Sequence, residues 1–169
     1  MDNEYIEKLL PEVREVRDDG LRRAVIKAWQ LAMEKGKWQS IDDVPFTLLT
    51  EAKTTLVEHT RAVTRMAVAI ADSRQDLDRD ILVAGGLVHD VGKLLEYCRS
   101  GDGIVKSEYG KRVRHPVSGF GVALEAGLPL EVAHIVAAHS KEGEGVARSP
   151  EAIVIHHCDF IDFDIAKSQ

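Results

Sequence analysis

The sequence predicts an all-α fold, a compact bundle of about six to eight helices within a single domain that spans residues 1–169. Apolar residues recur at steps of three and four in most segments, which is the spacing of one helix face. Glycine and proline stand where one such segment ends and the next begins. With 44% hydrophobic and 30% charged residues, the 169-residue chain is long enough for one sizeable core.

The periodic segments divide the chain into an N-terminal helical extension, residues 1–50, and a core, residues 51–169. Pro11 is expected to open a helix of its own, and Gly36 to end the helix before it. The connection 37–50 contains a short helix start at Asp42–Asp43, and the extension is predicted to carry no chemistry. Helices are predicted at residues 2–10, 20–35, 51–72, 116–126, 129–140 and 151–167.

One further helix is capped by Asp76 or Asp78 and runs through the adjacent pair His89–Asp90. The pair lies in the most apolar stretch of the chain, residues 84–95, AGGLVHDVGKLL. Burying a carboxylate is costly unless it is paired or bound to a metal, and the imidazole beside it supplies a second ligand atom. Taken alone, the pair is more simply interpreted as a core histidine hydrogen-bonded to an aspartate.

Other histidines and an aspartate change that interpretation, because they also lie on apolar faces of predicted helices or are fixed by a following proline. They are His59, His115, His139 and Asp159. Several buried histidines and two buried carboxylates are satisfied together if they converge on a metal centre. His134 lies about 140° round the helix from His139 and is predicted to stay outside the site.

The ordered pattern H…HD…H…H…D, with HDVGK at its centre, resembles the HD-domain superfamily of metal-dependent phosphohydrolases over about residues 50–165. The resemblance implies that the metal site lies between helices. It implies these core ligands: His59, His89, Asp90 and Asp159. With two ions, it implies that Asp90 bridges them and that His115 and His139 complete the second site. It also gives catalytic roles to Asp90 and Lys93, where Lys93 either faces the phosphate or is a solvated lysine at the end of the helix.

The stretch 99–114 is rich in glycine and basic residues, and alternation over 104–113 permits a short hairpin. It is either a solvated loop or a mobile cationic lid over an anionic substrate. The second interpretation adds substrate-binding candidates to Lys93: Lys106, Lys111, Arg112 and Arg114.

These features predict a metal-dependent phosphohydrolase that cleaves a phosphomonoester or phosphodiester, of a nucleotide or another small phosphorylated substrate, with metal-activated water. The mixed donors suit two divalent ions of Mn, Fe, Co, Ni or Zn. No Gly-Tyr-Pro follows His139, which argues against the branch that cleaves cyclic dinucleotides. The ending SPEAIVIHHCDFID is similar to members that include a 3′-to-5′ exoribonuclease. A di-iron oxygenase on the same ligands and a non-catalytic nucleotide sensor stay open as alternatives.

Bulk properties set the expected surroundings. The net charge of −6 argues against a nucleic-acid coat protein, so no stable nucleic-acid complex is expected. No apolar run could span a bilayer, and the N-terminus lacks a secretory signal. Cys98 and Cys158 are expected to be free thiols in a reducing cytoplasm. A homo-oligomer is compatible with these properties.

Overall fold

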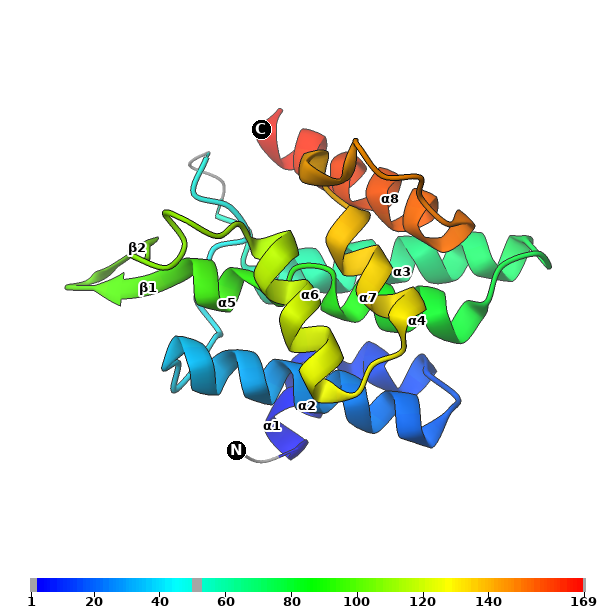
Figure 1. Cartoon of the computed structure of the whole chain (residues 1–169), viewed down its shortest axis with the longest axis horizontal. Coiled ribbons are helices and arrows are strands. Elements are labelled where there is room, and N and C mark those ends of the chain that lie inside the picture. The colour runs from blue at the N-terminus through cyan, green and yellow to red at the C-terminus, as the bar shows by residue number, and fades with distance from the viewer. Residues whose placement is uncertain (1–2, 50–52, 169) are drawn as a thin grey trace.

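A computed structural model describes residues 3–49 and 53–168, and it confirms the all-α class (Figure 1). The helices are α1 Asn3–Leu9, α2 Asp19–Gly36, α3 Leu56–Ser73, α4 Arg79–Val88, α5 Lys93–Glu96, α6 His115–Ala126, α7 Leu130–Ala138 and α8 Pro150–Lys167, with 3-10 turns at Pro11–Glu15 and Lys141–Gly143. Strands β1 Tyr97–Ser100 and β2 Gly103–Lys106 form an antiparallel hairpin.

Helix α4 is the centre of the bundle, and every residue from Leu82 to Val88 is buried. It contacts α2 on one side and α3, α7 and α8 on the others. In Figure 1, α2 lies along the bottom of the molecule and α8 along the top, with α3 and α4 between them. The residues that follow α4 therefore lie in the interior of the molecule.

The pair His89–Asp90 lies in a turn, so the prediction of one helix through it was wrong. Asp78 caps α4 as predicted, but the helix ends at Val88 and α5 begins at Lys93. The chain turns here because Gly92 packs against the start of α6. A Cβ on Gly92 would lie 2.1 Å from the carbonyl oxygen of His115, which only glycine avoids.

Other helix boundaries also differ from the prediction. Helix α3 begins at Leu56 because Thr55 and Glu58 form a capping box, whereas the predicted start at residue 51 lies outside the described residues. Gly36 is the last residue of α2, and Lys37 adopts the left-handed conformation with φ 59°. Gly36 is instead required by close contact, since its Cβ would lie 2.0 Å from the carbonyl oxygen of Leu94.

Two expectations for the connections need correction. The hairpin spans Tyr97–Lys106 and turns at Gly101 and Asp102, so only its second strand overlaps the predicted stretch 104–113. Residues Asp42–Asp43 form a turn and do not start a helix. The turn 101–102 fits its glycine, because Gly101 has φ 59°.

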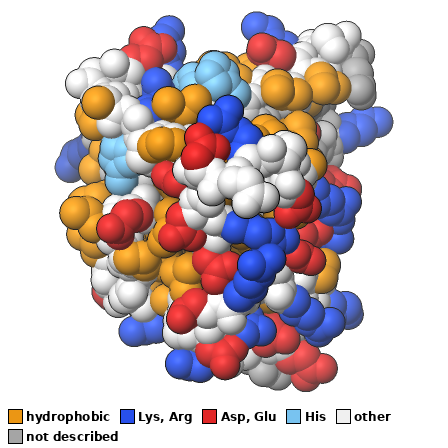
Figure 2. All heavy atoms as spheres, turned by 90° about the vertical axis from the view of Figure 1, so that its right-hand side faces the viewer, with side chains coloured by type: hydrophobic (Ala, Val, Ile, Leu, Met, Phe, Trp, Pro, Cys, Tyr) orange, Lys and Arg blue, Asp and Glu red, His pale blue; other side chains and the backbone are white. Residues whose placement is uncertain are grey.

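The surface carries both signs of charge. Figure 2 shows acidic and basic side chains interleaved on the face at the right of Figure 1, with hydrophobic groups scattered between them. Within residues 3–49 and 53–168, no helix has the length and apolar character needed to cross a membrane.

Candidate metal centre

The structure brings all six predicted metal ligands together. They form two groups whose ligand atoms lie within 4.8 Å of one another, the first made by His59, His89, Asp90 and Asp159 and the second by Asp90, His115 and His139. His59, His89 and His139 are fully buried, and Asp90 is 1% exposed. Helices α3, α6 and α8, the end of α7 and the turn after α4 therefore meet at one point.

In the four-ligand group, Nε2 of His59 lies 3.1 Å from Oδ1 of Asp159 and 3.4 Å from Oδ2 of Asp90. Nε2 of His89 lies 3.3 Å from Nε2 of His59 and 3.4 Å from the same Asp90 oxygen. Donor atoms about 2.0–2.2 Å from one ion are separated by about 3.0–3.5 Å, so these spacings fit a bound cation.

In the three-ligand group, Nε2 of His115 and Nε2 of His139 are 3.4 Å apart. Oδ1 of Asp90 lies 3.3 Å from the first nitrogen and 3.6 Å from the second. The two oxygens of Asp90 thus face different groups, which is the arrangement of a bridging carboxylate.

The four histidines share one orientation, with Nδ1 bonded outward and Nε2 facing the centre. Nδ1 of His89 donates to the Gly86 carbonyl at 2.7 Å, and Nδ1 of His139 to the Val136 carbonyl at 2.8 Å. The other two bond to carboxylates, His59 to Asp162 at 2.6 Å and His115 to Glu96 at 3.0 Å.

This orientation tests whether the residues fit a metal ion. A neutral imidazole that donates through Nδ1 presents a lone pair at Nε2. Four such lone pairs and two carboxylates then face one another in the interior, which is unfavourable unless a cation lies among them. The donor set therefore fits divalent metal binding, as imidazole and carboxylate oxygens suit such ions.

The carboxylates of the cluster favour a positive charge among them, whether a proton on His59 or a cation. Burial lowers the pKa of His59, but hydrogen bonds with Asp159, Asp162 and Asp90 outweigh it and raise that pKa to about 10. Burial raises the pKa of Asp159, but the hydrogen bond with His59 outweighs it and lowers that pKa to about 2. The carboxylates are thus held ionised and attract positive charge.

Lys93 is buried beside the cluster. Its Nζ donates to Oδ2 of Asp90 and to the carbonyl oxygen of Phe46, each at 2.5 Å. Burial lowers the pKa of Lys93, but the charge of Asp90 outweighs it and raises that pKa. The ammonium therefore stays charged, and it lines the cavity above the predicted metal ligands.

A cavity of about 500 Å³ opens over the cluster. Of the basic loop residues, Lys106 and Arg114 line it, whereas Lys111 and Arg112 are exposed and do not line it, so a substrate contact by those two stays a prediction. Lys106 Nζ lies 3.3 Å from Glu96, and Arg114 forms ion pairs with both Glu96 and Glu142.

One wall of this cavity was not predicted from the sequence. Residues Phe46–Leu49 line it, although the extension was predicted to carry no chemistry. The Phe46 ring lies 4.7 Å from the His59 ring and 6.0 Å from the Phe163 ring. Other lining residues not predicted are Glu96, Tyr97, Ser140, Lys141, Glu142, Phe160 and Phe163. Asp162, also missed, was detectable one turn after Asp159 on the same helix.

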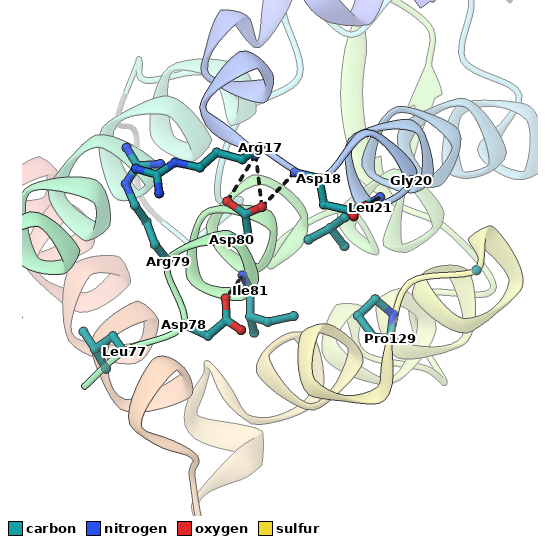
Figure 3. A pocket seen from close by; sticks show the side chains of 11 residues that line it. Arg17, Asp18, Gly20, Leu21, Leu77, Asp78, Arg79, Asp80, Ile81 and Pro129 are labelled. Carbon is teal, nitrogen blue, oxygen red and sulfur yellow. Dashed lines mark hydrogen bonds between the residues drawn. The ribbon is translucent and has the colours of Figure 1, made fainter. Parts of the chain in front are cut away.

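A larger cavity, about 790 Å³, lies elsewhere, between the starts of α2 and α4 (Figure 3). There the Asp80 carboxylate accepts hydrogen bonds from the backbone nitrogens of Arg17 and Asp18, as Figure 3 shows. Among the residues that the structure describes, no histidine lines it. His134 is likewise away from the cluster, with Nε2 accepting from the Ser149 backbone nitrogen at 3.1 Å.

Comparison with known proteins places this geometry in a family. The chain is 27% identical over 173 residues to a dihydroneopterin 2′,3′-cyclic phosphate phosphodiesterase of Methanocaldococcus jannaschii, covering 95% of this chain and 70% of that protein. It is 28% identical over 124 residues to the 3′-5′ exoribonuclease YhaM of Bacillus velezensis, covering 63% of this chain and 38% of that protein. No solved structure matches the chain significantly. The model of the HD domain matches residues 56–164, and the chain belongs to this family.

Proposed function

We propose that the chain is a metal-dependent phosphohydrolase, and that a phosphodiester is the bond it cleaves. The observation that carries the proposal is the pair of ligand groups joined through Asp90 at the floor of a cavity with basic side chains. Both named relatives cleave phosphodiesters, one in a cyclic phosphate and one in RNA. We expect two ions of Mn, Fe, Co, Ni or Zn, with the ligands predicted from the sequence.

The cavity supports a small substrate that carries a flat ring. Its volume of about 500 Å³ is in the range of small-molecule sites. One side is apolar and aromatic, formed by Phe46, Phe160 and Phe163, and the other side is charged. A nucleobase or pterin on the aromatic side would leave the phosphate over the ligand groups.

The chain's own residues would bind and orient the phosphate. Divalent ions, when bound, supply polarisation of phosphate oxygens and a water of lowered pKa. Lys93 holds Asp90 in place and adds a buried positive charge near the phosphate. Arg114 and Lys106 line the charged side, where Glu96 and Glu142 hold them in position.

The test is turnover of a substrate panel by protein stripped with a chelator and reloaded with Mn²⁺. We expect 2′,3′-cyclic nucleoside monophosphates to be hydrolysed faster than nucleoside triphosphates, under air and without oxygen alike. Asp90→Asn should lose both bound metal and turnover, whereas His134→Ala should keep both. Equal activity of Asp90→Asn and the wild type would reject the proposal. Oxygen-dependent turnover would favour an oxygenase instead, and binding without any product would favour a sensor.

A further inference from the structure

Helix α8 holds the imidazole of His59 at both of its nitrogens. Asp159 lies 3.1 Å from Nε2, and Asp162 lies 2.6 Å from Nδ1. The two aspartates are three residues apart, about one turn of the helix. His59 itself comes from α3 and is fully buried, and α8, which packs against α3, contacts the ring at both nitrogens.

The carboxylate on Nδ1 distinguishes His59 from two of the other histidines. Nδ1 of His89 and of His139 each bond to a backbone carbonyl three residues earlier. A backbone carbonyl fixes the ring but carries no net charge. A carboxylate fixes the ring and also carries a negative charge, which raises the basicity of the imidazole and its strength as a ligand.

Asp162 also differs from Glu96, the carboxylate that holds His115. Glu96 is 1% exposed and accepts from Arg114, the backbone nitrogen of His115 and the His115 ring, with Lys106 close by. Its charge is therefore divided among several donors. Within the described part of the chain, His59 is the side chain that the Asp162 carboxylate contacts. The charge of Asp162 thus acts on one ring.

We propose that Asp162 is a positioning residue that sets the metal affinity of the four-ligand group through His59. It fixes the proton on Nδ1, so that Nε2 presents its lone pair to the ion, and it strengthens that ligand. The three-ligand group, which His59 does not join, is not affected. This inference rests on the proposed metal centre.

The experiment is a titration of metal-free protein with Mn²⁺, with free Mn²⁺ counted by electron paramagnetic resonance. The wild type should bind two ions in two steps, the tighter at the group with more protein ligands. Asp162→Asn keeps the shape of the side chain but removes its charge. We expect it to weaken the tighter step about 10–100-fold and to leave the weaker step unchanged. Asp164→Asn, an exposed position on the same helix, is the matched control and should change neither step.

The outcomes separate this inference from the proposed function. If the wild type binds no Mn²⁺, the metal centre itself is wrong. If Asp162→Asn binds as the wild type does, or if both steps weaken equally, the positioning role is overturned. Should that variant not fold, the Zn²⁺-loaded wild type provides a second measurement. Its His59 Nδ1 proton should be slow to exchange with water in nitrogen-resolved NMR, and fast exchange would overturn the inference.

Discussion

The indole nitrogen of Trp29 donates a 2.9 Å hydrogen bond to the carbonyl oxygen of Leu87, two residues before His89. Trp38 repeats the pattern, with its indole donating at 2.6 Å to the carbonyl oxygen of Leu94. Both carbonyls belong to the short segment that turns at Asp90. The N-terminal extension therefore satisfies buried backbone groups on either side of the candidate metal centre.

Trp29→Phe should lower the free energy of unfolding by at least about 1–3 kcal/mol, since it leaves the buried Leu87 carbonyl without its donor. Loss of the larger ring adds to this cost. Urea denaturation followed by circular dichroism measures the change. Met33→Leu, a volume-conserving change at a buried position of the same helix, should cost less than about 1.5 kcal/mol. Equal stability of Trp29→Phe and the wild type would show that the bond contributes nothing.

Gly92→Ala should destabilise the fold strongly, by several kcal/mol on the order of a severe core substitution. The added methyl would lie 2.1 Å from the His115 carbonyl oxygen and 2.6 Å from the Gly119 nitrogen, both backbone atoms that cannot move independently. Gly121→Ala is the control, because its Cβ would meet nothing within 4 Å. In that exposed helical position alanine should stabilise by roughly 0.5–1 kcal/mol. Thermal melts should show a lower melting temperature for Gly92→Ala and a higher one for Gly121→Ala than for the wild type.

The ion pair of Glu142 with Arg114 should make stability depend on acid pH. Partial burial raises the pKa of Glu142, but hydrogen bonds from Arg114 and Ser140 outweigh it and lower that pKa to about 2 from 4.5. Because the folded-state pKa is depressed, the contribution is complete above about pH 4.5 and disappears as the pH falls towards 2. Glu142→Gln should therefore be less stable than the wild type at pH 6. The difference between their free energies of unfolding should be smaller at pH 3.

The exposed Glu144→Gln serves as the control for that comparison. Urea unfolding at the two pH values gives the difference in free energy of unfolding directly. If that difference for Glu142→Gln is the same at pH 6 and pH 3, Glu142 does not stabilise the fold through its charge.

The two cysteines should differ in their reaction with iodoacetamide. Cys158 is fully buried, and burial raises the pKa of its thiol to about 11, whereas Cys98 is half-buried on β1. Since the thiolate is the reactive form, native protein at pH 8 should be alkylated at Cys98 and protected at Cys158. Mass spectrometry of native and urea-unfolded samples distinguishes the two sites. Rapid modification of Cys158 in the native protein would mean that α8 opens readily.

The helices and the ligand cluster could be predicted because their signals are local. Each ligand histidine and Asp159 lies on an apolar face, or is fixed beside a proline, and these features are visible within a few residues. The capping residue Asp78 acts within three residues and could be predicted in the same way. The prediction that these residues meet at one site then followed from the free-energy cost of burying several polar groups separately.

The features that escaped prediction depend on contacts between distant segments. The end of α4 is set by Gly92 packing against α6, which an apolar run does not reveal. Lys106 lies at the end of β2 and lines the cavity, whereas Lys111 lies in the turn beyond the hairpin, and the sequence did not show where the hairpin would end. The aromatic wall from Phe46 depends on how a connection without a regular period folds back over α3.

The wall formed by Phe46–Leu49 lies outside residues 56–164, the part that defines the family. One wall of the cavity is thus encoded apart from the predicted metal ligands, although Phe160 and Phe163 of the aromatic side lie on the same helix as Asp159. Substitutions in the upstream stretch would reshape that wall while every predicted ligand stays in place. Relatives with identical ligands therefore need to be compared at this upstream connection before a shared substrate is assigned to them.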